Sequence, residues 1–344
     1  MIIPDAVPPQ ISDRTGNTRP KRCLVTGGSG FLGSYLVAAL TEAGQSVCII
    51  DPVRPDPLLP GVNYVAGSVT DPASARRALE GVECVYHLAG IAHLWTPCRD
   101  DFDRINRQGT EVMLAAAREM GVPRFVHCSS YTSLLSPQKN PHSIDEMVAV
   151  SRDDLAGPYS LSKYMAEKAS QAAADAGQNV VIVNPTILIG AKDRNLTPGT
   201  AMLLHFLHAR VFYYIETMLN LVHAQDIAHG MMLAAERGRT GERYLLGGDN
   251  ISLSSVLDLL DRISGRAKRR IPVSPAIAVV AGRAMEFIAT HFTRGIPSAT
   301  DEGVQLALRS RPIDSDKARR ELGYEPRSAE LALTDAIRWA LSQP

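Results

Sequence analysis

Short apolar runs alternate with amphipathic stretches along the first half of the chain. The runs are rich in Val, Ile and Cys and are too short for helices, so we expect strands at 23–26, 46–51, 62–66, 84–89, 124–129 and 179–183. The stretches between them predict helices at 31–43, 73–80, 101–120 and 159–176. Because each crossover helix must return over one face, the alternation predicts an α/β fold with a doubly wound parallel Rossmann sheet.

The pattern is less regular after residue 190. An apolar run that leads into a helical stretch at 221–235, and a short run at 243–246, predict a return to the sheet, whereas residues 252–344 indicate mostly helices. One stretch there carries apolar residues at helical spacing: Ile277, Val280, Ala281, Ala284, Ile288 and Phe292. We expect them to pack in the core of the C-terminal region; the alternative is an apolar wall for a lipid-like or polycyclic substrate.

Composition narrows the functional classes. The 344 residues include 36 Lys and Arg and 36 Asp and Glu, a net charge of zero. This balance provides neither the basic face that nucleic acids require nor a reason to expect binding to an acidic membrane. No apolar run is long enough to span a membrane, since the best candidate is interrupted by Arg283 and Glu286.

Cysteine usage favours a reducing compartment, and hence a cytoplasmic protein. The count is odd, no C-x-x-C pair occurs, and the spacing fits neither a disulfide framework nor a metal site. Four of the five lie in the predicted strand runs, where thiols are commonly buried and inert: Cys23, Cys48, Cys84 and Cys128, with Cys98 outside them.

Three glycines follow the first predicted strand. Gly27, Gly30 and Gly33 have the spacing G-x-x-G-x-x-G and lead directly into a helix. In this context the first glycine permits a tight turn, the second lets a pyrophosphate approach, and the third lets the helix pack closely on the sheet. The N-terminus of that helix offers N–H groups to the phosphates. The sequence therefore predicts dinucleotide binding.

Asp51 ends the second predicted strand, where a carboxylate can accept hydrogen bonds from the adenosine ribose. It would repel a 2′-phosphate, so we expect NAD as the cofactor, with NADP kept as an alternative because Arg54 lies nearby.

This motif sets the expected domain organisation. Residues 1–20, which contain four prolines, form a flexible N-terminal arm, and residues 21–190 form the dinucleotide-binding domain, to which 219–248 return. Residues 191–218 and 249–344 form a smaller, mostly helical substrate-binding region.

A second motif supplies acid–base chemistry. Tyr159 and Lys163 stand at i and i+4 on one helix face, where the ammonium can bring the phenol pKa toward the working range. Ser129 and Ser130 end the fifth strand, at the sheet edge where α/β proteins bind ligands, and Ser130 is preferred on the family comparison below.

These motifs together resemble an extended short-chain dehydrogenase/reductase of the NAD-dependent epimerase/dehydratase family. The resemblance runs from about Lys21 nearly to the C-terminus and is closest to dihydroflavonol-reductase-like, 3β-hydroxysteroid-dehydrogenase-like and hopanoid-associated sugar-epimerase-like members. It rests on TGGSGFLG, HLAG, the N-x-x-G-T of residues 106–110, LVHAQDIAHG and ARRELGYEPR, besides Asp51, the serine pair and Y-x-x-x-K.

The resemblance implies roles for individual residues. Tyr159 would exchange a proton with the substrate oxygen, Lys163 would lower its pKa and bind the nicotinamide ribose, and Ser130 would polarise a carbonyl. The implied cofactor contacts are Gly27, Gly30, Phe31, Leu32, Gly33, Asp51, Ser68, Val69, Leu88, Ala89, Gly90, Asn106, Tyr159, Lys163, Asn184 and Pro185. His93 and Trp95, which follow the fourth strand, are candidate substrate contacts together with Ser130.

Two positions depart from the family pattern. Ser68 stands where members commonly have an Asp that contacts adenine. Leu219 stands four residues before His223, where nucleotide-sugar epimerases commonly carry an Arg that binds the sugar pyrophosphate. Because leucine cannot pair with phosphate, this argues against a nucleotide-sugar substrate, although Arg194 or Arg210 could substitute.

Three functions are compatible with these motifs. The first is an NAD(P)-dependent oxidoreductase that interconverts a secondary alcohol and a ketone on an apolar or non-nucleotide small molecule. The second is a sugar epimerase or dehydratase that keeps NAD tightly bound, and the third is a non-catalytic NAD(P)-sensing protein, which the Tyr/Lys pair disfavours. The resemblance also implies a homodimer formed through helices near 101–120 and 159–176.

Overall fold

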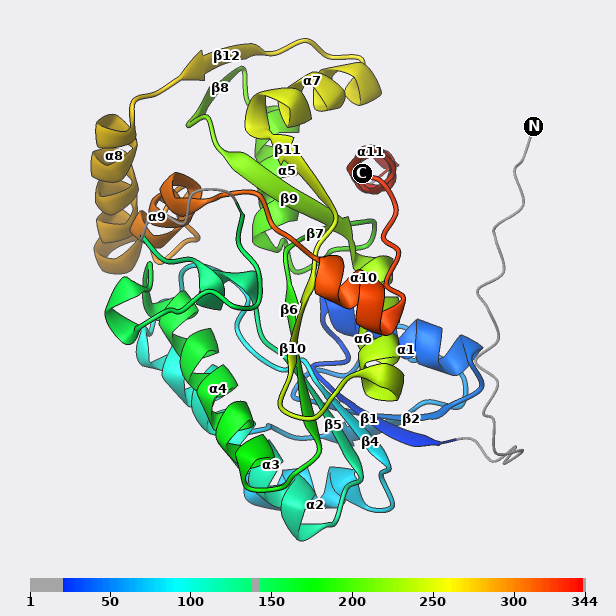
Figure 1. Cartoon of the computed structure of the whole chain (residues 1–344). Helices are drawn as coiled ribbons and strands as arrows, with labels where there is room; N and C mark the ends of the chain where they lie inside the picture. The colour runs from blue at the N-terminus through cyan, green and yellow to red at the C-terminus, as the bar shows by residue number, and fades with distance from the viewer. Residues whose placement is uncertain (1–20, 138–142, 343–344) are drawn as a thin grey trace, which may run out of the picture.

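Seven parallel strands form the central sheet of the computed structural model, which describes residues 21–137 and 143–342. The predicted N-terminal arm, residues 1–20, lies outside the described residues. The strand order is β10-β6-β5-β4-β1-β2-β3, so the chain moves outward in both directions from β1 (Figure 1). The strands are β1 (Arg22–Thr26), β2 (Ser46–Asp51), β3 (Asn63–Ala66), β4 (Cys84–His87), β5 (Arg124–Cys128), β6 (Val180–Pro185) and β10 (Arg243–Leu246). The predicted doubly wound α/β fold is confirmed.

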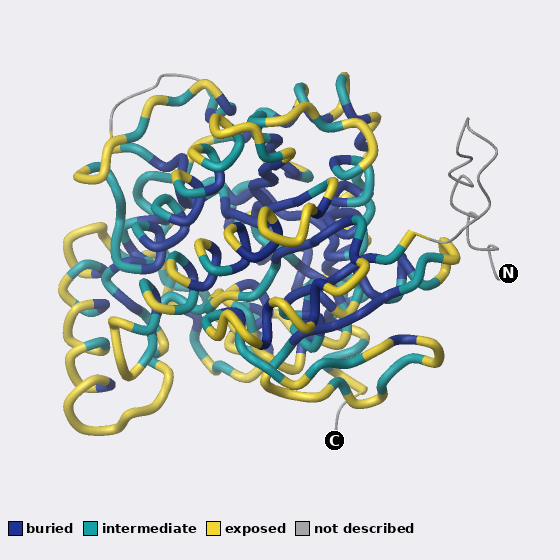
Figure 2. Tube along the Cα trace, turned by 90° about the horizontal axis from the view of Figure 1, so that it is seen from below, coloured by how far each residue is buried: buried dark blue, intermediate teal, exposed yellow. Residues whose placement is uncertain are grey.

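Helices cover both faces of this sheet. On one face lie α1 (Phe31–Glu42) and α6 (Ala224–Arg237); on the other lie α2 (Pro72–Leu79), α3 (Gly109–Glu119) and α4 (Pro158–Asp175) (Figure 1). Because side chains alternate along a strand, Val25 packs toward α1 and Leu24 toward α2. The buried residues therefore gather in the central strands and the inner faces of the helices (Figure 2).

The helix expected at 101–120 has two parts. A π-helical segment, η1 (Phe102–Gln108), precedes α3. π-helical turns occur frequently at functional sites, and this one contains Asn106, a candidate cofactor residue.

The C-terminal region contains two small sheets that the sequence did not predict. One has the order β11-β9-β7 and the other pairs β12 with β8. The strands are β7 (Ile187–Ile189), β8 (Val211–Tyr214), β9 (Met218–His223), β11 (Asp249–Ser252) and β12 (Arg269–Pro272). The helices are α5 (Pro198–His208), α7 (Leu253–Ser264), α8 (Pro275–Ile288) with the π-helical η4 (Ala289–Thr293), α9 (Asp301–Arg309) and α11 (Ala329–Ser342).

The boundary between the dinucleotide-binding domain and the C-terminal region does not follow the residue ranges expected from the sequence in every detail. Within the predicted return, β10 joins the central sheet and α6 packs on it, but β9 pairs in the smaller sheet. In addition, α10 (Asp316–Leu322) packs against α6 and β10, and Leu322 and Tyr324 are buried in the core of the first domain. The tail thus contributes to both regions.

Helix α8 buries small side chains and exposes large apolar ones, which is the reverse of the expected orientation. Ala278 and Gly282 are buried, whereas Ile277, Val280 and Phe292 are exposed. The expectation that the large apolar residues of this stretch pack in the core is therefore wrong, because the inward face of the helix carries small residues.

The predicted placement of the cysteines agrees with the fold. Cys23, Cys48, Cys84 and Cys128 lie buried on strands as free thiols, and Cys98 is exposed. In the part of the chain that the structure describes, no helix is both long and apolar enough to cross a membrane.

Two buried histidines lie side by side on β4 and at the end of β5. The His87 ring makes hydrogen bonds with the hydroxyls of Thr26 and Thr110, both at 2.9 Å, and stacks on His127. Neither ring nitrogen of His127 has a hydrogen-bond partner among the described residues. Burial lowers the pKa of His87 to about 3 and lowers that of His127 well below its ordinary value.

These rings make stability fall with acid. Below about pH 6.5 the unfolded chain protonates both histidines while the folded protein does not, so each should cost about 1.4 kcal/mol of unfolding free energy per pH unit. The substitution His127→Phe should reduce this slope by about 1.4 kcal/mol per pH unit between pH ~6 and ~4, as measured by urea unfolding. The matched control, Val126→Ala at a buried residue of the same strand that does not titrate, should lower stability without changing the slope; an unchanged slope in His127→Phe would contradict the assignment.

Candidate active site

The start of α4 places the tyrosine and the lysine at the carboxyl edge of the sheet. The helix begins at Pro158, so Tyr159 lies in its first turn and Lys163 one turn later on the same face. Both side chains are buried, and Lys163 Nζ donates a hydrogen bond to the carbonyl oxygen of Cys128 at 2.8 Å. This bond anchors the catalytic face of α4 to the end of β5.

The two serines after β5 point to different partners. Ser130 contacts the phenol of Tyr159 and accepts a hydrogen bond from the hydroxyl of Thr132 at 3.0 Å. Ser129 instead donates to Glu167 Oε2 at 2.6 Å. The structure therefore brings Ser130, and not Ser129, together with Tyr159. Thr132 orients the Ser130 hydroxyl and was not among the residues singled out from the sequence.

Burial dominates the electrostatics of the pair. It raises the pKa of Tyr159 above its ordinary value, while the contact with Ser130 acts in the opposite direction. It also lowers the pKa of Lys163. In this state the phenol is held protonated, as a proton donor, and the stabilisation of its anion comes from Ser130.

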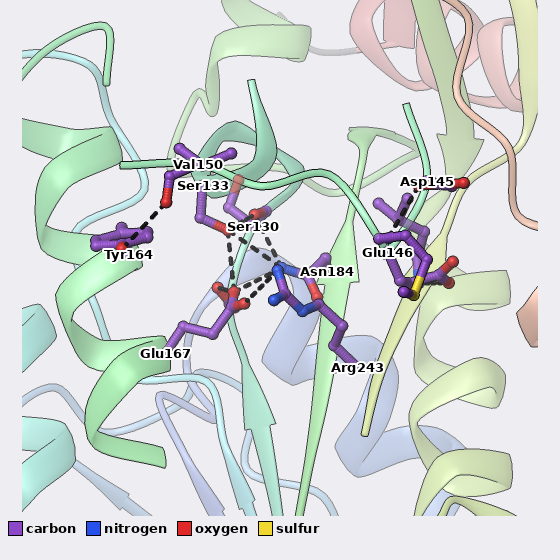
Figure 3. A network of polar contacts seen from close by, with 12 residues as sticks. Ser130, Ser133, Asp145, Glu146, Val150, Tyr164, Glu167, Asn184 and Arg243 are labelled. Carbon is purple, nitrogen blue, oxygen red and sulfur yellow. Dashed lines mark hydrogen bonds and ion pairs between the residues drawn. The ribbon is translucent and has the colours of Figure 1, made fainter. Parts of the chain in front are cut away.

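A buried carboxylate organises the strand ends behind this site (Figure 3). Glu167 Oε2 accepts hydrogen bonds from Ser129 Oγ, from Ser133 Oγ at 3.0 Å and from Asn184 Nδ2 at 2.8 Å. Its Oε1 pairs with Arg243 Nη1 at 3.3 Å. One side chain thus ties α4 to the carboxyl ends of β5 and β6 and to the first residue of β10.

The same network places two predicted cofactor residues. The amide of Asn184 also donates to the carbonyl oxygen of Ser130 at 3.1 Å, so it fixes the turn that carries this serine. Pro185 ends β6 and pairs in register with Leu246. Asn184 therefore supports the site from behind. Glu167 could have been found in the sequence, because it continues the four-residue spacing of Tyr159 and Lys163.

A second carboxylate joins the C-terminal region to the catalytic helix. Glu302, on α9, accepts hydrogen bonds from the backbone N–H groups of Tyr159 and Ser160, at 3.0 and 2.7 Å, and from the Ser160 hydroxyl at 2.6 Å. A carboxylate at a helix N-terminus is favourable. Gly157 allows the approach, since a side-chain carbon there would lie 2.6 Å from Glu302 Oε2. No sequence signal connects residues so far apart.

The glycine loop has the shape that a dinucleotide needs. Gly27 has a φ of +70°, and a side-chain carbon at Gly33 would lie 2.2 Å from the carbonyl oxygen of Gly27. At Gly30 such an atom would meet little besides that same oxygen at 3.2 Å and Asn195 at 3.8 Å. No side chain caps the start of α1, so the N–H groups of Phe31, Leu32 and Gly33 can face an anion. These residues fit the pyrophosphate of NAD.

The adenosine side of the loop is formed by the ends of β2 and β3. The Asp51 carboxylate accepts from the backbone N–H groups of Val53 at 3.0 Å and Ser29 at 3.3 Å, which places it beside the glycine loop. Ser68 hydrogen-bonds Thr70 in the turn after β3, and Val69 is buried next to Gly109. The predicted residues therefore converge here. The sequence missed Asn195, whose segment reaches over Gly30.

The loop after β4 links this site to the catalytic helix. A side-chain carbon at Gly27 would lie 2.9 Å from the Ala89 backbone, and one at Gly90 would lie 3.8 Å from Lys163 Nζ. Asn106 holds the loop, because it bonds both backbone groups of Ile91 and donates to Ser162 Oγ at 2.8 Å. Leu88 completes the predicted lining and donates its N–H to Thr26.

The two candidate substrate residues lie farther along this loop. Trp95 is buried, and its Nε1 donates to Thr290 Oγ1 at 3.2 Å. His93 is half-buried, and burial lowers its pKa. The structure thus brings Trp95 against the C-terminal region. Among the described residues, no cluster of three His, Cys, Asp or Glu side chains could hold a metal ion.

A glycine loop at the switch point of a parallel sheet, with a Tyr/Lys/Ser set at the same edge, defines a dinucleotide-dependent enzyme of the Rossmann class. The particular family follows from comparison with known proteins. Residues 23–247 match the NAD dependent epimerase/dehydratase family, and the chain belongs to it. Its cofactor is NAD.

Relatives with assigned names cover nearly the whole chain. The putative dihydroflavonol 4-reductase of Synechocystis is 35% identical over 324 residues, which are 92% of this chain and 93% of that protein. Sterol demethylase protein B of Methylococcus capsulatus is 31% identical over 328 residues, 92% and 97% of the two chains. The crystal structure of gox2253 superposes with a TM-score of 0.81 and 33% identity, covering 93% and 97%.

The network predicts that Glu167 positions Ser130 indirectly. Glu167→Gln keeps the shape of the side chain but replaces one carboxylate oxygen by an amide nitrogen, which cannot accept a hydrogen bond. If the nitrogen takes the place of Oε2, the serine hydroxyls and Asn184 lose their acceptor; if it takes the place of Oε1, Arg243 loses its partner. We expect a destabilisation of about 1–3 kcal/mol in urea unfolding and a roughly tenfold lower kcat, with the KM for NAD within about twofold of wild type. The control is Gln171→Glu, one turn along α4 and half-exposed; equal kinetics for Glu167→Gln and wild type would contradict the role.

Proposed function

We propose that the protein is an NAD-dependent oxidoreductase that interconverts a secondary alcohol and a ketone on an apolar, non-nucleotide substrate. The observation that carries the proposal is the contact between Ser130 and Tyr159 at the edge where Lys163 is anchored to Cys128. Bound NAD supplies a hydride acceptor, and its reduced form a hydride donor.

Each residue then has a definite task. Tyr159 gives a proton to the carbonyl oxygen during reduction, or removes it from the alcohol during oxidation. Ser130 donates a hydrogen bond to the same oxygen, with Thr132 supplying the hydrogen bond that orients it. Lys163, which donates to the Cys128 carbonyl and lies beside Gly90, would bind the nicotinamide ribose.

Two observations support the apolar substrate. Leu219 is buried in the apolar core of the C-terminal region, among Phe212 and Leu253, where nucleotide-sugar epimerases commonly have an arginine. Of the possible substitutes, Arg194 donates to the carbonyl oxygen of Asp56, in the loop after β2. The name of one relative, sterol demethylase protein B, points to a polycyclic substrate for that protein.

Removing the phenol hydroxyl tests the chemistry. Tyr159→Phe should lower turnover by about 10²- to 10⁴-fold, because proton transfer is lost, while NAD binding measured by fluorescence titration stays within about twofold. The matched control is Tyr164→Phe on the same helix, whose hydroxyl donates to the carbonyl oxygen of Val150 at 3.2 Å, and which should keep near-normal turnover. Near-normal turnover in Tyr159→Phe would refute the assignment.

The assay also separates the rival functions. Wild-type protein with NAD and a panel of sterols and other apolar secondary alcohols should show net formation of reduced cofactor. Purified protein that retains NAD and epimerises a sugar without net oxidation would favour the epimerase. Cofactor binding without turnover across the panel would favour a sensor.

We further propose a homodimer in the cytoplasm. Helices α3 and α4 lie side by side on the outer face of the sheet and present a shallow groove. Its floor is apolar and its edges are polar; the lining residues are Leu114, Ala115, Ala169 and Ala173, with Glu111, Arg118 and Gln178. Pairing of two copies over this groove predicts a mass of twice 37.2 kDa by light scattering at micromolar concentration. A monomer mass would contradict it.

A further inference from the structure

Helix α8 and the turn after it carry their large apolar side chains on the outside of the molecule. Ile277 is 61% exposed, Val280 68%, Phe287 57% and Phe292 74%, and Ile296 is exposed as well. The positions Ile277, Val280, Ala284, Phe287 and Ile288 fall on one helix face, because they are three, four or seven residues apart. The helix stands at the margin of the molecule, with α9 on its inner side (Figure 1).

The opposite face explains why this orientation is fixed. Ala278 and Gly282 pack inward, and a side-chain carbon at Gly282 would lie 3.0 Å from the carbonyl oxygen of Thr300 and 3.1 Å from Val304. Glu286, the acidic residue of the helix, also has hydrogen-bond partners in this orientation: it accepts from Arg99 at 3.4 Å and from the Asp301 N–H at 3.0 Å. A rotation that buried the phenylalanines would bring larger side chains against α9.

The segment that contains this face is basic, although the whole chain is neutral. Residues 266–296 contain one acidic residue, Glu286, and six basic residues: Arg266, Lys268, Arg269, Arg270, Arg283 and Arg294. Arg270 is paired with Asp258 and Asp261, Lys268 donates to backbone carbonyls, and Arg283 is paired with Asp301 at 3.3 Å, so the border is carried by the exposed arginines at 266, 269 and 294. Apolar residues bordered by exposed arginines are the composition of helices that lie in the surface of an anionic bilayer.

We propose that this surface, residues 275–296, docks the protein on anionic phospholipid membranes and takes up its apolar substrate there. A second copy of the chain fits the surface less well, because a two-fold interface would bring the basic border against itself. The neutral net charge gave no reason to expect binding to an acidic membrane, but a local cluster of charges can act where the total charge is zero.

Two short series of contacts between residues connect the docking surface to the candidate catalytic residues. Thr290, in η4, accepts the hydrogen bond from Trp95 on the loop that continues the cofactor lining. Gly282 packs on Thr300, which caps α9, and Glu302 in that helix binds the first turn of α4 at Tyr159. A sterol-sized molecule that leaves a bilayer at α8 would therefore meet the substrate side of the site. This part of the inference rests on the proposed function.

Vesicle sedimentation tests the surface without any substrate. The full-length protein should bind vesicles of phosphatidylcholine with about one-third phosphatidylglycerol and bind pure phosphatidylcholine at least about tenfold more weakly. The double variant Phe287→Ser/Phe292→Ser should lower the partition coefficient about tenfold or more, and Arg269→Gln/Arg294→Gln should remove most of the preference for the anionic lipid. The matched control is Met147→Ser, at a residue 85% exposed elsewhere, with unchanged binding.

The outcomes separate this inference from the proposed function. If wild type fails to bind anionic vesicles, or if the phenylalanine variant binds as wild type does, the docking surface is wrong even when turnover of a water-soluble ketone is normal. If the phenylalanine variant instead lowers the mass measured by light scattering, the surface joins two copies and the membrane is excluded. Docking also predicts that this variant raises the KM only for a ketone presented in vesicles; equal KM values for both forms would overturn substrate uptake at the membrane.

Discussion

The buried carboxylate of Glu167 is the interaction on which the geometry of the site depends. It accepts hydrogen bonds from donors at the carboxyl ends of β5 and β6 and in the turn after β5, and it pairs with Arg243 on β10. Since removing one partner of a buried charged network leaves another uncompensated, the arrangement has few alternatives. Tyr159 is thereby held at the sheet edge, and Ser130 rather than Ser129 faces it, because Glu167 binds Ser129.

Sequence patterns predicted the strands and helices of the first domain well, because these elements are determined by local patterns of apolar residues. Parallel strands buried on both faces form continuous apolar runs, and the runs at β1, β2 and β5 were readable with boundaries within a residue or two. The same patterns failed in the C-terminal region. There β8 and β12 are short and pair only with each other, and α8 has an apolar stripe that a periodicity argument assigns to a core. Which side of an amphipathic helix is buried depends on its neighbours, here the small residues facing α9.

The candidate catalytic set could be proposed from the sequence because Tyr159, Lys163 and the glycine loop follow fixed spacings within single elements. The residues that hold them could not. Glu302 and Asn195 come from segments more than 130 residues distant from Tyr159 and Gly30, respectively, and only the tertiary structure brings them close. The raised pKa of Tyr159 could not be predicted from the sequence either. Burial raises this pKa, and the degree of burial depends on the assembled site.

The bond between Glu302 and the start of α4 has a consequence for how the protein is made. The chain emerges from the ribosome with the glycine loop, β5 and α4 complete long before α9 exists, and the central sheet itself waits for β10 at its edge. Contacts of such long sequence separation form late in folding. A growing chain can therefore hold a recognisable nucleotide fold while the backbone N–H groups of Tyr159 and Ser160 still lack their carboxylate, and chemical competence arrives only when the last third of the molecule has closed over the first.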